Sequence, residues 1–175
     1  MINLEKFDYS TKRAIFSQCQ AVNCPNLEIE FIEEFIKREY TVIFVTVNQP
    51  YYKIKKEFEK VGGNGHLFFI DCVSNIPKSK NSDKQVRYVN TGSLEKIQRA
   101  IEKIWKSLPG KKLLFFDCGE ILVVKFGVKE TFNFVHSNIQ KMQRDGVVIF
   151  CFLKETMDKP TENIFRHLFD ESIFL

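Results

Sequence analysis

Hydrophobic and polar positions along the chain follow two alternating patterns, short apolar runs typical of strands and longer stretches with the spacing of helices. The apolar runs predict strands at residues 14–20, 41–47, 66–71, 86–89, 113–117, 147–153 and 173–175. The helical spacing predicts helices over residues 28–38, between Pro50 and Gly62, over 94–108 and 129–144, and from Pro160 onward. The chain therefore alternates strands with helices along nearly its whole length.

This alternation predicts an α/β fold with three layers, in which helices cover both faces of a mainly parallel sheet. The continuous apolar runs at 113–116 and 147–153 agree, because strands buried on both faces lack a polar side. The sequence contains no internal repeat and no low-complexity segment. We expect a single domain over residues 1–175.

Composition adds one unusual property, since 18 of the 175 residues are phenylalanine. We expect a core filled with aromatic rings, which could leave an apolar patch for a partner. The formal net charge of +4 is small. One denser basic stretch runs from Lys78 to Arg87, but lysines elsewhere are spread over several faces. This spread favours solvated surface lysines over a nucleic-acid footprint.

The sequence favours a cytoplasmic protein that does not cross a membrane. No apolar run approaches the length that a bilayer requires. The charged residues Glu5, Lys6 and Asp8 argue against a secretory signal. The five cysteines form no Cys-x-x-Cys pair, and four lie in apolar runs where a free cysteine acts as a small hydrophobe. A reducing compartment fits this pattern.

Polar side chains follow several of the predicted strands. In an open α/β sheet, ligands bind beyond the carboxyl ends of the strands. Asn23, Asn48, Asp71 and Asp117 fall at those ends and are the candidate ligand-binding residues. A structural alternative stays open, in which Asn48 caps a helix while Asp71 and Asp117 accept hydrogen bonds from loop amides.

The order of these segments resembles the RecA/KaiC-like branch of the P-loop ATPases, especially its small archaeal members. The resemblance rests on the runs Val42–Pro50, Phe69–Ser74, Leu114–Asp117 and Phe169–Ile173, and on the helix that contains Phe132 and Val135. It covers nearly the whole chain from about residue 14. Within the resemblance, Asp117 matches the aspartate that holds Mg²⁺ beside a bound triphosphate.

The chain departs from that family where the chemistry lies. Val22–Glu28 stands at the place of the phosphate-binding loop, without its glycines, lysine or hydroxyl residue. Glu28 adds negative charge where phosphate would sit. Asn48 and Gln49 stand at the place of the glutamate that activates water, and an amide cannot act as a general base. The resemblance thus implies a degenerate domain with Asp117 as a vestigial metal ligand, no catalytic residues and no bound ATP or Mg²⁺.

The resulting functional hypothesis is a catalytically inactive RecA/KaiC-like domain that binds a protein partner, or itself as a small homo-oligomer, in regulation or signalling. The alternative is a nucleotide- or small-molecule-binding protein that uses the carboxyl edge of the sheet without hydrolysis. DNA binding is not favoured, because the segments 119–129 and 154–160, where DNA-binding relatives carry long basic loops, are short and of mixed charge.

Two further kinds of chemistry find little support in the sequence. A hydrolase could pair Cys118 with His136 on the next predicted helix, although His136 shares a face with Phe132 and Ile139 that is typical of packing. A zinc site would need ligands in close pairs, and His66, His136 and His167 are isolated.

Overall fold

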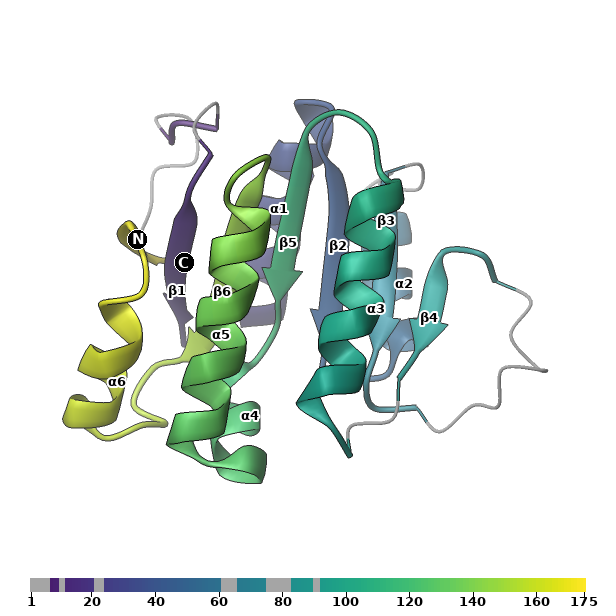
Figure 1. The fold of residues 1–175 in the computed structure, drawn as a ribbon. Coiled ribbons are helices and arrows are strands. Elements are labelled where there is room, and N and C mark those ends of the chain that lie inside the picture. The colour runs from purple at the N-terminus through teal and green to yellow at the C-terminus, as the bar shows by residue number, and fades with distance from the viewer. Residues whose placement is uncertain (1–6, 10–11, 21–23, 61–65, 75–82, 90–91) are drawn as a thin grey trace.

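A seven-stranded parallel sheet forms the centre of the protein (Figure 1). The computed structural model describes residues 7–9, 12–20, 24–60, 66–74, 83–89 and 92–175. Its strands are β1 (Ala14–Cys19), β2 (Thr41–Thr46), β3 (Leu67–Asp71), β4 (Val86–Tyr88), β5 (Lys112–Phe116), β6 (Val147–Leu153) and β7 (Glu171–Phe174). They lie in the order β4-β3-β2-β5-β6-β1-β7, and neighbouring strands pair in parallel. The predicted parallel sheet is therefore confirmed.

Helices cover both faces of this sheet and complete the three layers (Figure 1). One face carries α1 (Cys24–Lys37) and α2 (Tyr51–Lys60), whose apolar residues join one buried cluster. The other face carries α3 (Leu94–Ser107), α4 (Gly119–Phe126), α5 (Val128–Met142) and α6 (Lys159–Arg166), which share a second cluster. The carboxyl ends of the strands lie at the lower edge of the sheet in Figure 1.

Phenylalanine fills both clusters, as the composition predicts. The fully buried ones are Phe16, Phe31, Phe35, Phe58, Phe115, Phe116, Phe150, Phe152 and Phe165. Stacked rings on neighbouring strands continue across the sheet, as for Phe116 and Phe150, whose centroids are 4.9 Å apart. None of the exposed large hydrophobic residues in the described part of the chain is a phenylalanine. A phenylalanine-rich patch for a partner is therefore not found there.

Two helices differ from the sequence-based expectation. Helix α1 begins at Cys24 rather than at residue 28, with Pro25 in its first turn, where proline costs no hydrogen bond. Residues 119–126, expected as a short loop, form α4. Gly119 lets α4 lie against β6, because a Cβ there would come within 2.5 Å of the Phe152 ring. The predicted helix stop at Gly62-Gly63 lies outside the described residues.

The cysteines agree with the expectation only in part. Cys72, Cys118 and Cys151 are free and buried, as small hydrophobic residues would be. Cys19 is disulfide-bonded, which differs from the expected free thiol. Among the described residues no helix has both the length and the apolar character needed to cross a membrane.

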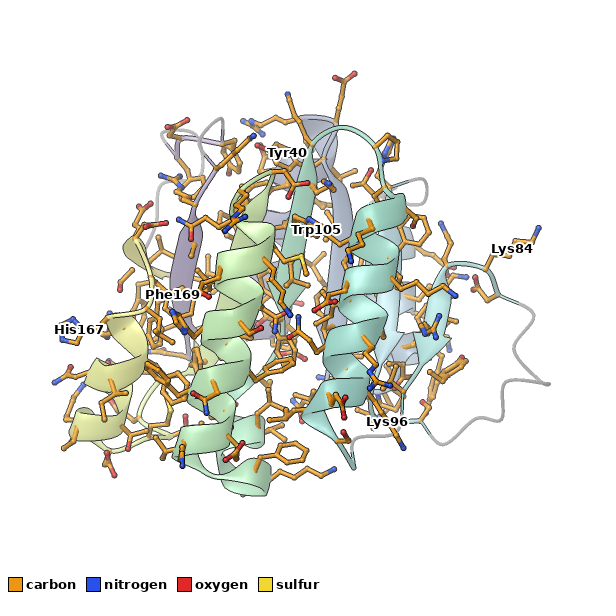
Figure 2. The ribbon with its side chains drawn as sticks, viewed as in Figure 1. Tyr40, Lys84, Lys96, Trp105, His167 and Phe169 are labelled. Atoms are coloured by element: carbon orange, nitrogen blue, oxygen red, sulfur yellow. The ribbon has the colours of Figure 1, made fainter. Side chains whose placement is uncertain are left out.

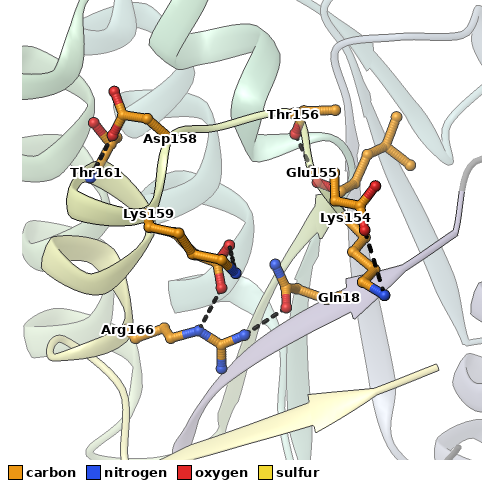
Figure 3. A network of polar contacts seen from close by, with 10 residues as sticks. Gln18, Lys154, Glu155, Thr156, Asp158, Lys159, Thr161 and Arg166 are labelled. Carbon is orange, nitrogen blue, oxygen red and sulfur yellow. Dashed lines mark hydrogen bonds and ion pairs between the residues drawn. The ribbon is translucent and has the colours of Figure 1, made fainter.

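A network of hydrogen bonds and ion pairs links α6 to strand β1 (Figure 3). The Arg166 guanidinium donates to Glu162 Oε1 at 2.9 Å and to the Gln18 side chain, and it lies 4.6 Å from the centroid of the Phe16 ring. Glu162 and Gln18 are both buried. Burial raises the pKa of Glu162, but hydrogen bonds from Arg166 and Lys159 outweigh it and hold that pKa below its ordinary value.

Arg166→Ala is expected to lower the free energy of unfolding by about 2 kcal/mol, because it leaves a buried carboxylate and a buried amide without their common donor. Urea denaturation measures the change. Arg99→Ala is the matched control, since Arg99 pairs with Glu95 on the exposed side of α3 and such pairs contribute little. Equal losses in the two variants would contradict a structural role for the Arg166 network.

Candidate functional site

A small cavity of about 130 Å³ lies at the carboxyl edge of the sheet. Two of the four predicted ligand-binding residues, Asn48 after β2 and Asp117 after β5, line it. Pro25, Glu28 and Ile29 of α1 line the cavity as well. Asp71 is not part of its lining, and Asn23 lies outside the described residues. The structure thus brings Asn48 and Asp117 together and adds Glu28 to them.

Asp71 has a structural role instead. Its Oδ2 accepts hydrogen bonds from the Tyr51 N–H at 2.9 Å and the Ser74 hydroxyl at 2.7 Å, and its Oδ1 accepts from the N–H groups of Val73 and Ser74. Tyr51 is the first residue of α2, so Asp71, at the end of the neighbouring strand, accepts a hydrogen bond from one of the free N–H groups at the start of this helix. No hydrogen bond from the exposed Asn48 to this helix is found among the described residues. The predicted cap at Asn48 is therefore replaced by Asp71.

Helix α1 occupies part of the segment that the sequence resemblance assigns to the phosphate-binding loop. Its first turns contain residues 24–28, where an ATPase would place a loop of free backbone N–H groups. Within these turns the Glu28 side chain is 5% exposed and faces the cavity. A buried carboxyl group therefore stands where the resemblance places a phosphate.

Asp117 lies at the end of β5 and is buried. Cys118, which follows it, adopts a left-handed backbone conformation with φ 58°, and this turns the chain sharply into α4. The Cys118 thiol donates to Asp117 Oδ1 at 2.8 Å. Burial raises the pKa of Asp117 to about 6, and the charge of Glu120 adds to the rise, while hydrogen bonds from Cys118 and Thr46 lower it. The carboxyl group thus binds a proton far better than an ordinary aspartate.

Two more buried carboxyl groups belong to the same neighbourhood. Burial and the charge of Asp117 raise the pKa of Glu28 well above its ordinary value. Glu120, in the first turn of α4, accepts a hydrogen bond from the Leu153 N–H at 3.2 Å, and burial raises its pKa too. Neither Asp117 nor Glu120 forms an ion pair within the described ranges. Glu28, Asp117 and Glu120, the carboxyl cluster, therefore give the site an acidic character.

The carboxyl cluster suits protons or cations rather than phosphate. Phosphate sites supply backbone N–H groups, lysine or arginine, and the described lining of this cavity contains no basic side chain. A second group of potential metal ligands, Cys19, Glu28 and Cys151, has its ligand atoms within 4.8 Å of one another. Cys19 is disulfide-bonded, however, and a disulfide sulfur lacks the thiolate charge that binds a metal.

The hypothetical pairing of Cys118 with His136 has no support from the structure. His136 is exposed on α5, and its Nε2 lies 3.0 Å from Gln140 Nε2, within hydrogen-bond distance. Cys118 is buried, and burial together with the Asp117 charge raises the pKa of its thiol. A nucleophilic cysteine requires the opposite shift.

Sequence reasoning identified Glu28 as a negative charge at a helix start but missed its place in a cluster with Asp117 and Glu120. The signal for Glu120 was weak, because residues 119–129 were interpreted as a loop and a loop glutamate is normally solvated. Once 119–126 form a helix packed on β6, Glu120 is carried inward. The cluster therefore depends on contacts between elements far apart in the sequence.

Solved structures of other proteins share this architecture. The flagellar accessory protein FlaH from Methanocaldococcus jannaschii is similar with a TM-score of 0.66 at 14% identity, over 95% of this chain and 72% of that one. The Pyrococcus horikoshii OT3 protein PH0250 is similar with a TM-score of 0.66 at 9% identity, over 99% and 87%. The KaiC-like protein PH0186 from the same organism has a TM-score of 0.61 at 12% identity, over 95% and 72%.

At these identities the likeness shows the fold, which is the three-layer RecA-like fold shared by KaiC-like proteins. None of the curated proteins compared with the chain matches its sequence. One protein family does match, over residues 35–175, from the last turn of α1 to the final residue. On that match, the chain belongs to a family of unknown function, DUF7504.

Proposed function

We propose that this chain is a RecA-like domain without ATPase activity, which acts in regulation or signalling by binding another protein or a second copy of itself. The observation that carries the proposal is the buried Glu28 carboxyl group, which lines the same cavity as Asp117. An ATPase keeps its acidic metal ligand beside a phosphate-binding loop, whereas here the acid faces another acid.

Electrostatics and size both support the absence of nucleotide binding. A triphosphate in the cavity would meet the carboxyl groups of Glu28 and Asp117 and gain no basic partner from its described lining. The cavity measures about 130 Å³. Sites for drug-sized ligands measure roughly 300–1,000 Å³, so the cavity is too small for a whole nucleotide unless its walls move.

The residues at the water-activating position support the absence of hydrolysis. Asn48 and Gln49, which the sequence resemblance puts at the position of the general base, line the cavity together with Asp117. An amide accepts no proton at neutral pH. Loss of the base and loss of the phosphate loop would each reduce ATPase activity independently.

A second candidate function follows from the cavity itself. Asn48 and Asp117 do line one cavity, as a binding site at the carboxyl edge requires. A small ligand of a few heavy atoms, neutral or cationic, would match its size and its acidic lining. This candidate predicts stabilisation by such a ligand and none by a nucleotide.

Thermal melting with and without Mg²⁺-ATP tests the proposal. A site that binds a ligand present at a hundred times its dissociation constant stabilises the fold by about 2.7 kcal/mol. We expect no such shift with ATP, ADP or GTP, and no phosphate release above that of Asp117→Ala. An active P-loop ATPase measured under the same conditions verifies that both assays detect activity.

A melting shift with Mg²⁺-ATP that disappears in Asp117→Ala would overturn the proposal, because it would show that Asp117 still works as a metal ligand. A shift with small amides or amines, lost in the same variant, would favour the second candidate function instead.

A further inference from the structure

Two cysteines and a glutamate from three different elements meet between α1 and the sheet. Cys19 ends β1, Cys151 lies in β6, and Glu28 comes from the second turn of α1. The two sulfur atoms and a carboxylate oxygen all lie within 4.8 Å of one another, and all three residues are buried. We call these residues the thiol cluster. Thiolate sulfur and carboxylate oxygen are both ligands of zinc, so the thiol cluster has the composition of a metal site.

The strand register brings the two sulfur atoms together. Ser17 pairs with Cys151 across β1 and β6, and Cys19 follows Ser17 by two residues, so these side chains point to the face that carries α1. The two Sγ atoms of Cys19 and Cys151 are 3.5 Å apart. Tetrahedral zinc, with zinc–sulfur bonds of about 2.3 Å, separates two thiolate sulfurs by about 3.7 Å. The strands therefore hold the sulfurs at nearly the spacing that one ion requires.

Glu28 supplies an oxygen from the helix above the two strands. A zinc–oxygen bond of about 2.0 Å would place this oxygen about 3.5 Å from each sulfur, so the flexible glutamate side chain has to move by only roughly 1 Å. Glu28 also lines the cavity of about 130 Å³ at the carboxyl edge. The thiol cluster thus lies beside a space that an ion can enter, and a fourth ligand position stays available for water.

The surroundings of the thiol cluster favour a cation. Asp117 and Glu120 lie close enough for their negative charges to act on Glu28. The described lining of the cavity contains no basic side chain. Buried negative charges are costly unless a cation or hydrogen bonds compensate them. A divalent ion bound to the thiol cluster would supply positive charge where the described side chains are acidic.

Ser17 is a second observation that points to a metal. The residue is fully buried. Apart from the Cys151 thiol, its hydroxyl has no hydrogen-bond partner in the part of the chain that the structure describes. A hydroxyl in this position can donate to the Cys151 thiolate, and metal ligands commonly accept such a hydrogen bond from a neighbouring group. The unused donor is therefore placed where a metal-bound thiolate needs one.

The oxidation state of Cys19 decides whether the ion can bind. Cys19 is disulfide-bonded in this structure, so its sulfur offers no thiolate charge. A dithiol reductant supplies two electrons and two protons, breaks the S–S bond and becomes a disulfide itself. Cys19 then carries a thiol, as Cys151 already does. A metal ion that binds both sulfurs displaces their two protons into the solvent.

From these observations we infer that the thiol cluster of the reduced protein binds one divalent cation of the zinc type through Cys19, Cys151 and Glu28. Thiolate ligands select zinc over Mg²⁺ and Ca²⁺, which prefer oxygen. The ion would join β1, β6 and α1, and oxidation of Cys19 to the disulfide would release it. The inference goes beyond the proposed function, because such an ion requires neither a protein partner nor the absence of ATPase activity.

Titration of the full chain with Co²⁺ tests this inference. The protein is reduced with a dithiol, which is then removed under inert gas. Cobalt bound to thiolates has a charge-transfer absorption in the near ultraviolet, and tetrahedral cobalt absorbs visible light strongly. We expect both signals in the reduced protein, saturation at one cobalt per chain, and loss of both when Zn²⁺ takes the same ligands. The oxidised protein should show neither signal.

Cys151→Ser and Glu28→Gln are each expected to weaken Zn²⁺ binding by at least about a hundredfold. Loss of a group that merely orients a metal ligand already weakens binding roughly ten- to a hundredfold. Competition between Zn²⁺ and Co²⁺ measures the affinity. Cys72→Ser is the matched control, since Cys72 is also a buried free cysteine but belongs to the apolar cluster on the other face of the sheet. Glu28→Gln keeps the test decisive if Cys151→Ser fails to fold.

Exposed histidines are the main alternative source of metal binding. His66, His136 and His167 are all exposed. Figure 2 shows His167 on the outer side of α6, a helix that packs on the opposite face of the sheet from α1. An ion bound there would give no cobalt–thiolate absorption and would not respond to oxidation of Cys19. We therefore expect His167→Ala to leave the cobalt signal unchanged.

Several results would overturn the inference. These are absence of the cobalt–thiolate absorption in the reduced protein, equal signals in the reduced and oxidised proteins, and equal losses of affinity in Cys72→Ser and Cys151→Ser. Cobalt bound without thiolate absorption also rejects the inference, because the ion would then lie on oxygen or histidine ligands. Melting with Mg²⁺-ATP decides the proposed function separately, so the thiol cluster and the loss of nucleotide chemistry can fail independently.

Discussion

Asp117→Asn is expected to make the protein more stable relative to the natural chain at about pH 8 than at about pH 4, by a difference of about 3 kcal/mol. An aspartate in the unfolded chain has a pKa of about 3.9. Burial raises the pKa of Asp117 in the folded protein to about 6. The folded state therefore binds a proton that the unfolded state releases.

The sign of the pH dependence follows from that difference. The stability linked to this proton is fully present below about pH 4 and is lost as the pH rises through about 6. Asparagine is neutral throughout and loses nothing over the same range. Its side-chain oxygen can still accept the hydrogen bond that Cys118 donates. Urea denaturation of both proteins at a series of pH values measures the effect.

A constant difference between the two proteins across the pH range would contradict a buried, proton-binding Asp117. It would also argue against the acidic character of the cavity on which the proposed function depends. Glu28→Gln is a second measurement of the same neighbourhood. It should show the same direction of change, because burial and the Asp117 charge raise the pKa of Glu28 as well.

Asp71, like Asp117, stands at the end of a strand of this sheet, but its substitution has a different consequence. Asp71→Ala is expected to lower the free energy of unfolding by about 4 kcal/mol. The substitution removes the acceptor of the buried Tyr51 N–H at the start of α2, and of two N–H groups and a hydroxyl in the turn after β3. Denaturation in urea at neutral pH gives the magnitude.

Asp71→Asn provides the matched comparison with Asp117→Asn. An amide can replace one carboxylate oxygen of Asp71 as an acceptor but presents N–H groups to the donors at the other. We therefore expect a loss of about 2 kcal/mol at neutral pH, which is larger than any loss that the same substitution causes at Asp117. An equal or larger loss at Asp117 would show that the two strand ends do not differ in the way their contacts indicate.

The sequence alone was sufficient to predict the three layers and most of the helices and strands. Continuous apolar runs such as Leu113–Phe116 and Val147–Leu153 identify strands buried on both faces, and the helical stripes between them require a cover on each side. The same patterns predicted that a ligand-binding site would lie at the carboxyl edge of the sheet. Asn48 and Asp117 do lie there together, because parallel strands end at a common edge.

Only the tertiary structure decided what each acid does. Asp71 and Asp117 look alike in sequence, each following an apolar strand, but one receives four hydrogen bonds while the other shares a cavity with Glu28. The start of α1 at Cys24 and the helix at 119–126 bring Glu28 and Glu120 inward. Burial and charge depend on neighbours distant in the chain, so sequence pattern determined the fold while packing determined the chemistry of its acids.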